Sequence, residues 1–246
     1  MARANTTLTV CDKSQISLYS WPLMDISPKE FECIKRELIK RVTSQSTGDI
    51  RSLSDYEFFE VCSQMGWNQH NAGYRALIET LANWIKGELG VGSAMELGSG
   101  PGYLISCLNY LGINTIGIDG NRYSQKFFQE AHPAYAHQYC LDKFFEYRYS
   151  PAQAFIAIEV FEHIPDEGLI KILNKVREEI RPEFIVFSST PYADIEPAWD
   201  VAWGHCNIKQ PDQWVDFFKN FGYELSPLRP PITEWASLYV DSRSSV

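Results

Sequence analysis

The sequence predicts an α/β fold, in which a doubly wound and mainly parallel sheet follows an N-terminal helical extension. Three observations predict it. From about residue 91 the chain alternates between short apolar segments and segments of helical period, which is typical of successive βαβ units. A glycine-rich turn follows the first apolar segment, and an acidic residue ends the second. Because the periodicity before this point is helical, we divide the chain into an extension or lid (residues 1–90) and a core (91–246).

The extension is expected to contain three helices. Ser27 and Ser54 are each followed three residues later by glutamate, which is the spacing of a capping box at a helix N-terminus. Asn68 or Asn71 is expected to cap the third helix, and Gly90 to end it. The first helix is predicted over about 28–42, the second after Ser54, and the third over 71–89.

The core is expected to alternate strands with helices, each helix ending near a glycine or before a loop. Strands are predicted at 93–98, 113–119, 136–141, 154–160, 184–189, 223–227 and 236–240. Helices are predicted at 101–111, 122–131, 167–180 and 211–221. After the fifth strand, Trp203 to Asn207 are expected on a loop, and no helix is predicted before residue 211.

Three glycines alternate in the turn between the first strand and the next helix, at Gly98, Gly100 and Gly102. Glycine lets the chain turn tightly, and the following helix N-terminus presents unpaired N–H groups to a ligand. A dinucleotide-binding fingerprint would require glycine or alanine where this chain has Tyr103, which weakens a nicotinamide interpretation. Asp119 ends the second strand about 20 residues later, where a carboxylate can accept hydrogen bonds from ribose hydroxyls.

The segment from Glu96 to Gly102 resembles motif I of the class I S-adenosylmethionine-dependent methyltransferases. The resemblance extends from about Met95 to Tyr239 and implies S-adenosylmethionine as cofactor. It assigns Glu96 to the methionine end of the cofactor, Asp119 to the ribose and Asp142, after the third strand, to the adenine. The glycines at 98, 100 and 102 complete the expected cofactor site. A catalytically inactive module that binds the cofactor stays as the alternative.

A second set of polar residues follows the fourth and fifth strands. If the chain turns helically after Ile158, then Glu159, Glu162 and His163 share one face, because they stand at i, i+3 and i+4. His205 follows the fifth strand on a segment expected at the same edge of the sheet. These four side chains are the candidate ligands of one divalent cation, with Glu159, His163 and His205 as candidate catalytic residues.

Glu159 to His163 is similar to the ExxEH motif of the ubiquinone-biosynthesis O-methyltransferases, and with His205 it also resembles the metal site of Hen1-type small-RNA 2′-O-methyltransferases. Two imidazoles favour Mn²⁺, Fe²⁺, Co²⁺ or Zn²⁺ over Mg²⁺. Such an ion would stabilise an acceptor alkoxide. In the alternative without metal, the motif orients the loop, and His163 or His205 serves as a general base.

The expected reaction is methyl transfer to a hydroxyl of a small molecule. Aromatic residues near the candidate site, at Tyr192, Trp199, Trp203 and Trp235, suggest a partly apolar acceptor, whereas Trp214 is expected to pack its helix onto the sheet. The alternatives are transfer to the terminal ribose of an RNA and a non-catalytic binding protein. The net charge of −9 argues against a broad nucleic-acid surface.

The rest of the composition bears on the environment of the protein. Six cysteines occur without the CxxC spacing of zinc clusters, which favours reduced thiols in the cytoplasm. Apolar runs are shorter than the roughly 20 residues of a membrane span, and no secretory leader is evident. The sequence leaves the oligomeric state open.

Overall fold

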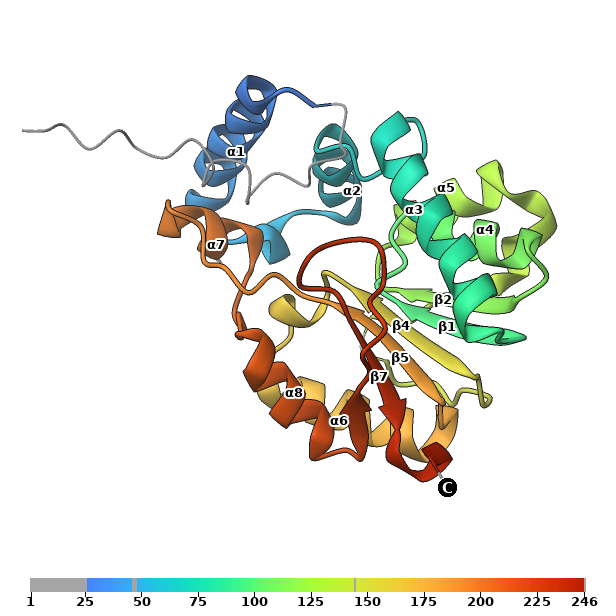
Figure 1. Cartoon of the computed structure of the whole chain (residues 1–246). Coiled ribbons are helices and arrows are strands. Elements are labelled where there is room, and N and C mark those ends of the chain that lie inside the picture. Colours follow the sequence, from blue (N-terminus) through green and yellow to red (C-terminus); the bar gives the residue numbers. More distant parts are fainter. Residues whose placement is uncertain (1–25, 46–47, 144, 246) are drawn as a thin grey trace, which may run out of the picture.

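The computed structural model describes residues 26–45, 48–143 and 145–245 (Figure 1). The first 25 residues of the predicted extension, including Cys11, lie outside the described residues. A central sheet carries helices on both faces; α1 (Pro28–Thr43) and α2 (Asp55–Gln64) lie at one end of it, whereas α3 (Ala72–Trp84) covers part of one face (Figure 1). The predicted α/β class is confirmed, and none of the described helices is long and apolar enough to cross a membrane.

The sheet has seven strands in the order β3-β2-β1-β4-β5-β7-β6. β1 to β5 run parallel, and β7 is antiparallel to both β5 and β6. β1 pairs with β2 on one side and β4 on the other, so the strand order reverses there and opens a ligand crevice at the carboxyl ends. The strands are β1 (Ser93–Leu97), β2 (Asn114–Asp119), β3 (Tyr139–Leu141), β4 (Ala154–Ile158), β5 (Phe184–Ser188), β6 (Tyr223–Leu225) and β7 (Ser237–Asp241).

Helices cover the two faces of the sheet and form two apolar cores. Successive residues of β4 alternate between them: Phe155 belongs to the core under α6 and α8, and Ile156 to the core under α3 and α4. Trp214 is buried in the first core, as predicted. The core helices are α4 (Tyr103–Tyr110), α5 (Arg122–Ala131), α6 (Asp166–Lys175), which continues as a π-helical turn (Val176–Ile180), and α8 (Pro211–Lys219).

The three predicted helices are present among the described residues of the predicted extension: α1 (Pro28–Thr43), α2 (Asp55–Gln64) and α3 (Ala72–Trp84), which continues as a π-helical turn (Ile85–Leu89). Both capping boxes form, at Ser27 and Ser54. Asn71 caps α3, where its side chain accepts a hydrogen bond from the amide of Tyr74 at 2.9 Å. Gly90 ends the helical run with a left-handed φ of 62°.

Two expectations about local structure are wrong. The segment after β5 contains a helix, α7 (Pro197–Trp203), because Pro197 opens it and Gly204 ends it in the left-handed conformation. Trp199 is buried in a third apolar cluster, which α7 shares with α1 and α2. The helices α7 and α1 lie side by side (Figure 1). The predicted strand 136–141 is a 3₁₀ helix up to Gln138, so β3 keeps only three residues.

Candidate functional site

The glycine-rich turn adopts a backbone that other residues disfavour, with φ of 73° at Gly98, 48° at Gly100 and 78° at Gly102. The outer two glycines are needed for packing. A Cβ on Gly98 would lie 2.3 Å from Cγ2 of Val160, and one on Gly102 would lie 2.3 Å from Cδ2 of Phe128. A Cβ on Gly100 would meet nothing within 4 Å among the described residues. The open space of the turn therefore lies above Gly100, where a ligand can approach the backbone.

Asp119 lies beside this turn at the end of β2. Its Oδ2 accepts a hydrogen bond from the amide of Gly100 at 2.8 Å, and its Oδ1 accepts one from the amide of Asn121 at 2.8 Å. Burial raises the pKa of Asp119 to about 6, although these amide donors act in the opposite direction. The carboxylate is thus fixed at the strand tip that the sequence assigned to the ribose.

Glu96 lies in β1 beneath the same turn and is buried. Its Oε2 has no hydrogen-bond partner among the described residues. Burial raises the pKa of Glu96 to about 8, and the charge of Asp119 adds to that effect. A buried acceptor without a donor is costly, which makes this oxygen a candidate partner for a donor on a ligand.

Asp142 follows β3, and its amide donates to the carbonyl of Asp119 at 3.0 Å. Its Oδ2 accepts hydrogen bonds from the amide of Tyr147 at 2.8 Å and from the hydroxyl of Tyr149 at 2.6 Å. Both predicted acids, Asp119 and Asp142, therefore lie at neighbouring strand ends. The protein itself already supplies donors to Asp142.

The extension contacts this part of the site, which sequence reasoning missed. The side-chain amide of Asn121 donates to the carbonyl of Asp55, at the start of α2, at 2.8 Å, and the amide of Arg122 approaches the Asp55 carboxylate at 3.3 Å. The charge of Asp55 also raises the pKa of Asp119. The extension thus packs against the candidate ribose end, although the division at residue 90 and its lid function stay predictions.

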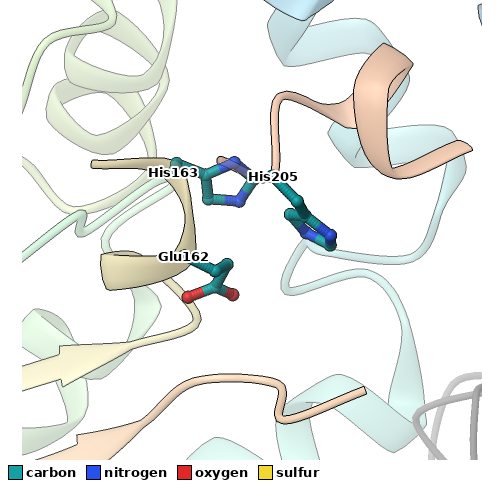
Figure 2. A group of neighbouring side chains, drawn as sticks. All are labelled: Glu162, His163 and His205. Atoms are coloured by element: carbon teal, nitrogen blue, oxygen red, sulfur yellow. The ribbon is translucent and has the colours of Figure 1, made fainter. Parts of the chain in front are cut away.

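A second polar group lies at the carboxyl edge near β4 and β5 (Figure 2). Three residues each offer one ligand atom, and these atoms lie within 4.8 Å of one another: Glu162, His163 and His205. Glu162 and His163 belong to a 3₁₀ turn (Phe161–His163), whereas His205 follows α7. The amides of Cys206 and Asn207 donate to the carbonyl of Glu162 at 2.8 and 3.0 Å, which ties the two segments together.

Within this group Glu162 is buried, whereas His163 and His205 are partly exposed. Glu162 is 1% exposed, and its Oε2 has no hydrogen-bond partner among the described residues. Burial and the neighbouring charge of Glu159 raise the pKa of Glu162. Burial lowers the pKa of His163 to about 3, and the proximity of His205, with ring centroids 4.9 Å apart, adds to that effect.

Glu159 does not share a helical face with Glu162, because its own φ of 51° is left-handed and interrupts any helical turn after β4. Its Oε2 accepts from the amide of Thr190 at 3.0 Å, and its Oε1 from the hydroxyl of Ser188 and from Nε1 of Trp235 at 3.0 Å. The carboxylate is therefore held by protein donors, outside the group of three. Its predicted role as fourth ligand stays a prediction.

The aromatic residues near the site divide into two kinds. Trp199 of α7 packs against α1, with Phe31 at a centroid distance of 5.8 Å, so it belongs to the apolar cluster between α7 and the extension. Trp203 lies closer to the site, with its ring 6.4 Å from that of His163. Tyr192 and Trp235 meet edge to face at 6.0 Å beside Glu159.

A carboxylate and two imidazoles that converge within 4.8 Å are suited to a divalent cation of the transition series. The Oε2 of Glu162, which has no hydrogen-bond partner in the described part of the chain, fits this ion, because coordination would satisfy the buried oxygen. His163 also fits, since a lowered pKa keeps its imidazole neutral, which is the form that binds metal. The same lowered pKa makes His163 a weak proton acceptor.

Comparison with known proteins identifies the family of the chain. Residues 67–228 match the family described as "Methyltransferase domain". The fold is similar to the mitomycin 7-O-methyltransferase MmcR, at 13% identity and a TM-score of 0.57 over 87% of this chain and 68% of that one. It is also similar to a putative O-methyltransferase from Nostoc punctiforme PCC 73102, at 14% identity and a TM-score of 0.58 over 86% and 68%.

A further structural similarity is to the small RNA methyltransferase HEN1, at 14% identity and a TM-score of 0.51 over 68% of this chain and 26% of that one. At these identities the similarities concern the fold alone. No curated protein matches the sequence.

Proposed function

The chain belongs to the methyltransferase-domain family, and is an S-adenosylmethionine-dependent methyltransferase; from this premise we propose that it methylates a hydroxyl group of a small molecule with the help of a divalent cation. The observation that carries the proposal is the convergence of Glu162, His163 and His205, in which the buried Oε2 of Glu162 has no hydrogen-bond partner among the described residues. This group and the glycine-rich turn follow β4 and β1, which are neighbours in the sheet.

We assign the cofactor to the turn above Gly100, with Asp119 as acceptor for its ribose and Glu96 for its methionine end. Asp142, at the end of the neighbouring strand, is the candidate for the adenine. When bound, S-adenosylmethionine supplies an electrophilic methyl group on a sulfonium. In the reaction the acceptor oxygen bonds to the methyl carbon, the electron pair of the broken carbon–sulfur bond stays on the sulfur of S-adenosylhomocysteine, and the hydroxyl proton is released to water.

We assign the cation to Glu162, His163 and His205, with Glu159 as an adjacent carboxylate. When bound, a divalent cation would lower the pKa of the acceptor hydroxyl and so supply the alkoxide. His163 contributes a neutral nitrogen rather than a proton acceptor, because burial lowers its pKa to about 3. Mn²⁺, Fe²⁺, Co²⁺ and Zn²⁺ match the mixed ligand set better than Mg²⁺ does.

A partly apolar acceptor is supported by Trp203, Tyr192 and Trp235, which contact His163 or flank Glu159. The extension serves as a lid in this proposal. The net charge of −9 favours a small molecule over the terminal ribose of an RNA.

The test measures both halves of the site in the full chain. Calorimetry with S-adenosylhomocysteine is expected to show binding that is lost in Asp119→Ala. Metal-stripped protein is expected to bind one Co²⁺ or Mn²⁺, and Glu162→Gln is expected to lose it. His137→Gln, which changes an exposed histidine, is the matched control and is expected to bind both.

Turnover is measured with phenols, aliphatic alcohols and a short RNA by mass spectrometry of the products. Methylation of phenols or alcohols that stops on chelation supports the proposal. Turnover that survives exhaustive chelation would refute the role of the cation. Methylation of the RNA alone would show that the acceptor is an RNA and not a small molecule. Cofactor binding without any turnover would indicate a non-catalytic binding protein.

A further inference from the structure

A buried chain of polar contacts leads from the first helix of the extension to the candidate metal ligand His205. Lys35 of α1 lies 2.6 Å from Oδ1 of Asp194, and the amide of Asp194 donates to Oδ2 of Asp200 at 2.6 Å. Oδ1 of Asp200, in α7, lies 2.8 Å from Nδ1 of His205. The four side chains are at most 12% exposed. Charged groups are rarely buried to this extent unless each has a partner.

The two oxygens of Asp200 determine which nitrogen of His205 carries the proton. Oδ2 is occupied by a backbone amide, which can only donate. Oδ1 is a carboxylate oxygen and can only accept, so Nδ1 of His205 must be the donor in their contact. The lone pair of the neutral ring then lies on Nε2. The amide of His205 also donates to the carbonyl of Asp200 at 2.8 Å, which fixes the backbone at the same point.

We propose that Asp200 is a positioning residue that holds His205 with Nδ1 protonated and Nε2 as the nitrogen that meets Glu162 and His163, and that Asp194 and Lys35 hold Asp200 in place. This inference rests on the proposed function, because it assigns to His205 a metal to bind. A metal-binding histidine commonly donates its other ring N–H to a carboxylate, and loss of such a partner weakens metal binding by about 10- to 100-fold.

The charges in this region agree with a bound cation. Asp194 and Asp200 bring two carboxylates to the buried chain, and Lys35 supplies one positive charge in return. Glu162 adds a further buried carboxyl group on the other side of His205. Lys35 balances only one of these negative charges, and a divalent cation at Nε2 of His205 would balance the remainder.

The chain also makes helix α1 a part of the site. Lys35 is buried where α1 packs on α7, and its ammonium lies 5.7 Å from the ring centroid of Trp199. The extension therefore contributes a charge that stabilises the carboxylates behind His205, in addition to its apolar contacts. Its effect reaches the ligand group through three side chains and one backbone amide.

The decisive variant is Asp200→Asn, because the fixed amide of Asp194 dictates how the new side chain lies. The carboxamide oxygen must accept from that amide, so the NH₂ group replaces Oδ1 and faces Nδ1 of His205. Nδ1 then has to accept, and the ring proton moves to Nε2. Asp200→Glu restores a carboxylate at this position, and Asp212→Asn, on the exposed surface of α8, is the matched control.

The first readout needs no metal. Long-range ¹H–¹⁵N spectra of histidine-labelled, metal-free protein at about pH 8 report the protonated nitrogen of each neutral ring. The chain has five histidines, so His205→Gln identifies the signals of His205. We expect Nδ1–H for His205 in the wild type, in Asp200→Glu and in Asp212→Asn, and Nε2–H in Asp200→Asn. The second readout is Co²⁺ affinity, which we expect to fall by about 10- to 100-fold in Asp200→Asn alone.

Binding of S-adenosylhomocysteine by every variant verifies the fold. Nε2–H for His205 in the wild type would overturn the inference by itself, even if Asp200→Asn failed to fold. An unchanged ring proton in Asp200→Asn, or an unchanged Co²⁺ affinity despite a moved proton, would overturn it as well. Failure of the wild type to bind Co²⁺ would refute the proposed metal site, whereas the ring-proton measurement would still decide the positioning role of Asp200.

Discussion

Replacing Glu96 with glutamine is expected to change how the stability of the cofactor-free protein depends on pH. Glu96 is buried in β1, its Oε2 has no partner among the described residues, and burial raises its pKa from 4.5 to about 8. The pKa of Glu96 is higher in the folded state than in the unfolded state. Its contribution to the free energy of unfolding is therefore fully present below about pH 4.5 and is lost as the pH rises to 8.

The magnitude follows from the pKa values. At about 1.4 kcal/mol for each pH unit, a rise from 4.5 to about 8 corresponds to about 5 kcal/mol. Water that enters on ionisation reduces this value, so we expect the wild type to lose about 2 to 5 kcal/mol relative to Glu96→Gln between these limits. Glutamine has nearly the same shape and cannot ionise, so its stability lacks this slope.

Urea denaturation at about pH 5, 6.5 and 8 measures the free energy of unfolding of each protein. Glu88→Gln, at an exposed position on the neighbouring helical turn, is the control and is expected to follow the wild type. The reasoning would be refuted if the free energies of unfolding of the wild type and Glu96→Gln differed by the same amount at all three pH values. That result would mean that Glu96 is hydrated or has a donor in solution.

Two further substitutions test the packing of the site. Gly98→Ala is expected to lower the free energy of unfolding by about 2 to 5 kcal/mol, because its Cβ would lie 2.3 Å from Val160 at a φ of 73°. The control Gly112→Ala has a φ of 80° but open space around it, and is expected to lose only about 1 to 2 kcal/mol. Equal losses in the two variants would contradict the packing argument. Trp235→Phe removes the 3.0 Å hydrogen bond to Glu159 and is expected to cost about 1 to 3 kcal/mol in thermal or urea denaturation, so an unchanged stability would show that this carboxylate does not need the indole.

The sequence predicted the fold class and the order of the core elements because both depend on local signals. Apolar alternation, helical period and capping residues are properties of short segments, and all seven expected strands are present in the sheet. Boundaries were less certain, and the expected strand at 136–141 shrank because its first residues form a 3₁₀ helix. The sequence predicted a mainly parallel sheet, whereas the order of the strands and the antiparallel direction of β7 are known from the structure alone.

The turn and the acidic strand ends were predictable for the same reason. Gly98, Gly100 and Asp119 belong to consecutive elements, and parallel neighbours must bring their carboxyl ends to one edge. The prediction that His205 lies near this edge required one additional assumption, namely that the segment after β5 returns to it. The sequence did not reveal that Gly98 is needed to make room for Val160 rather than for a ligand.

The sequence alone therefore determined the doubly wound core, the glycine-rich turn and which residue types converge near the candidate site. Tertiary structure alone decided that the Glu159 carboxylate is held by protein donors, that α7 is a helix, and that Lys35 reaches Asp194 across about 160 positions of the chain. The physical reason is that these features arise from packing between distant segments. A buried charge selects its partner by distance and desolvation in space, and no local period or spacing encodes that choice.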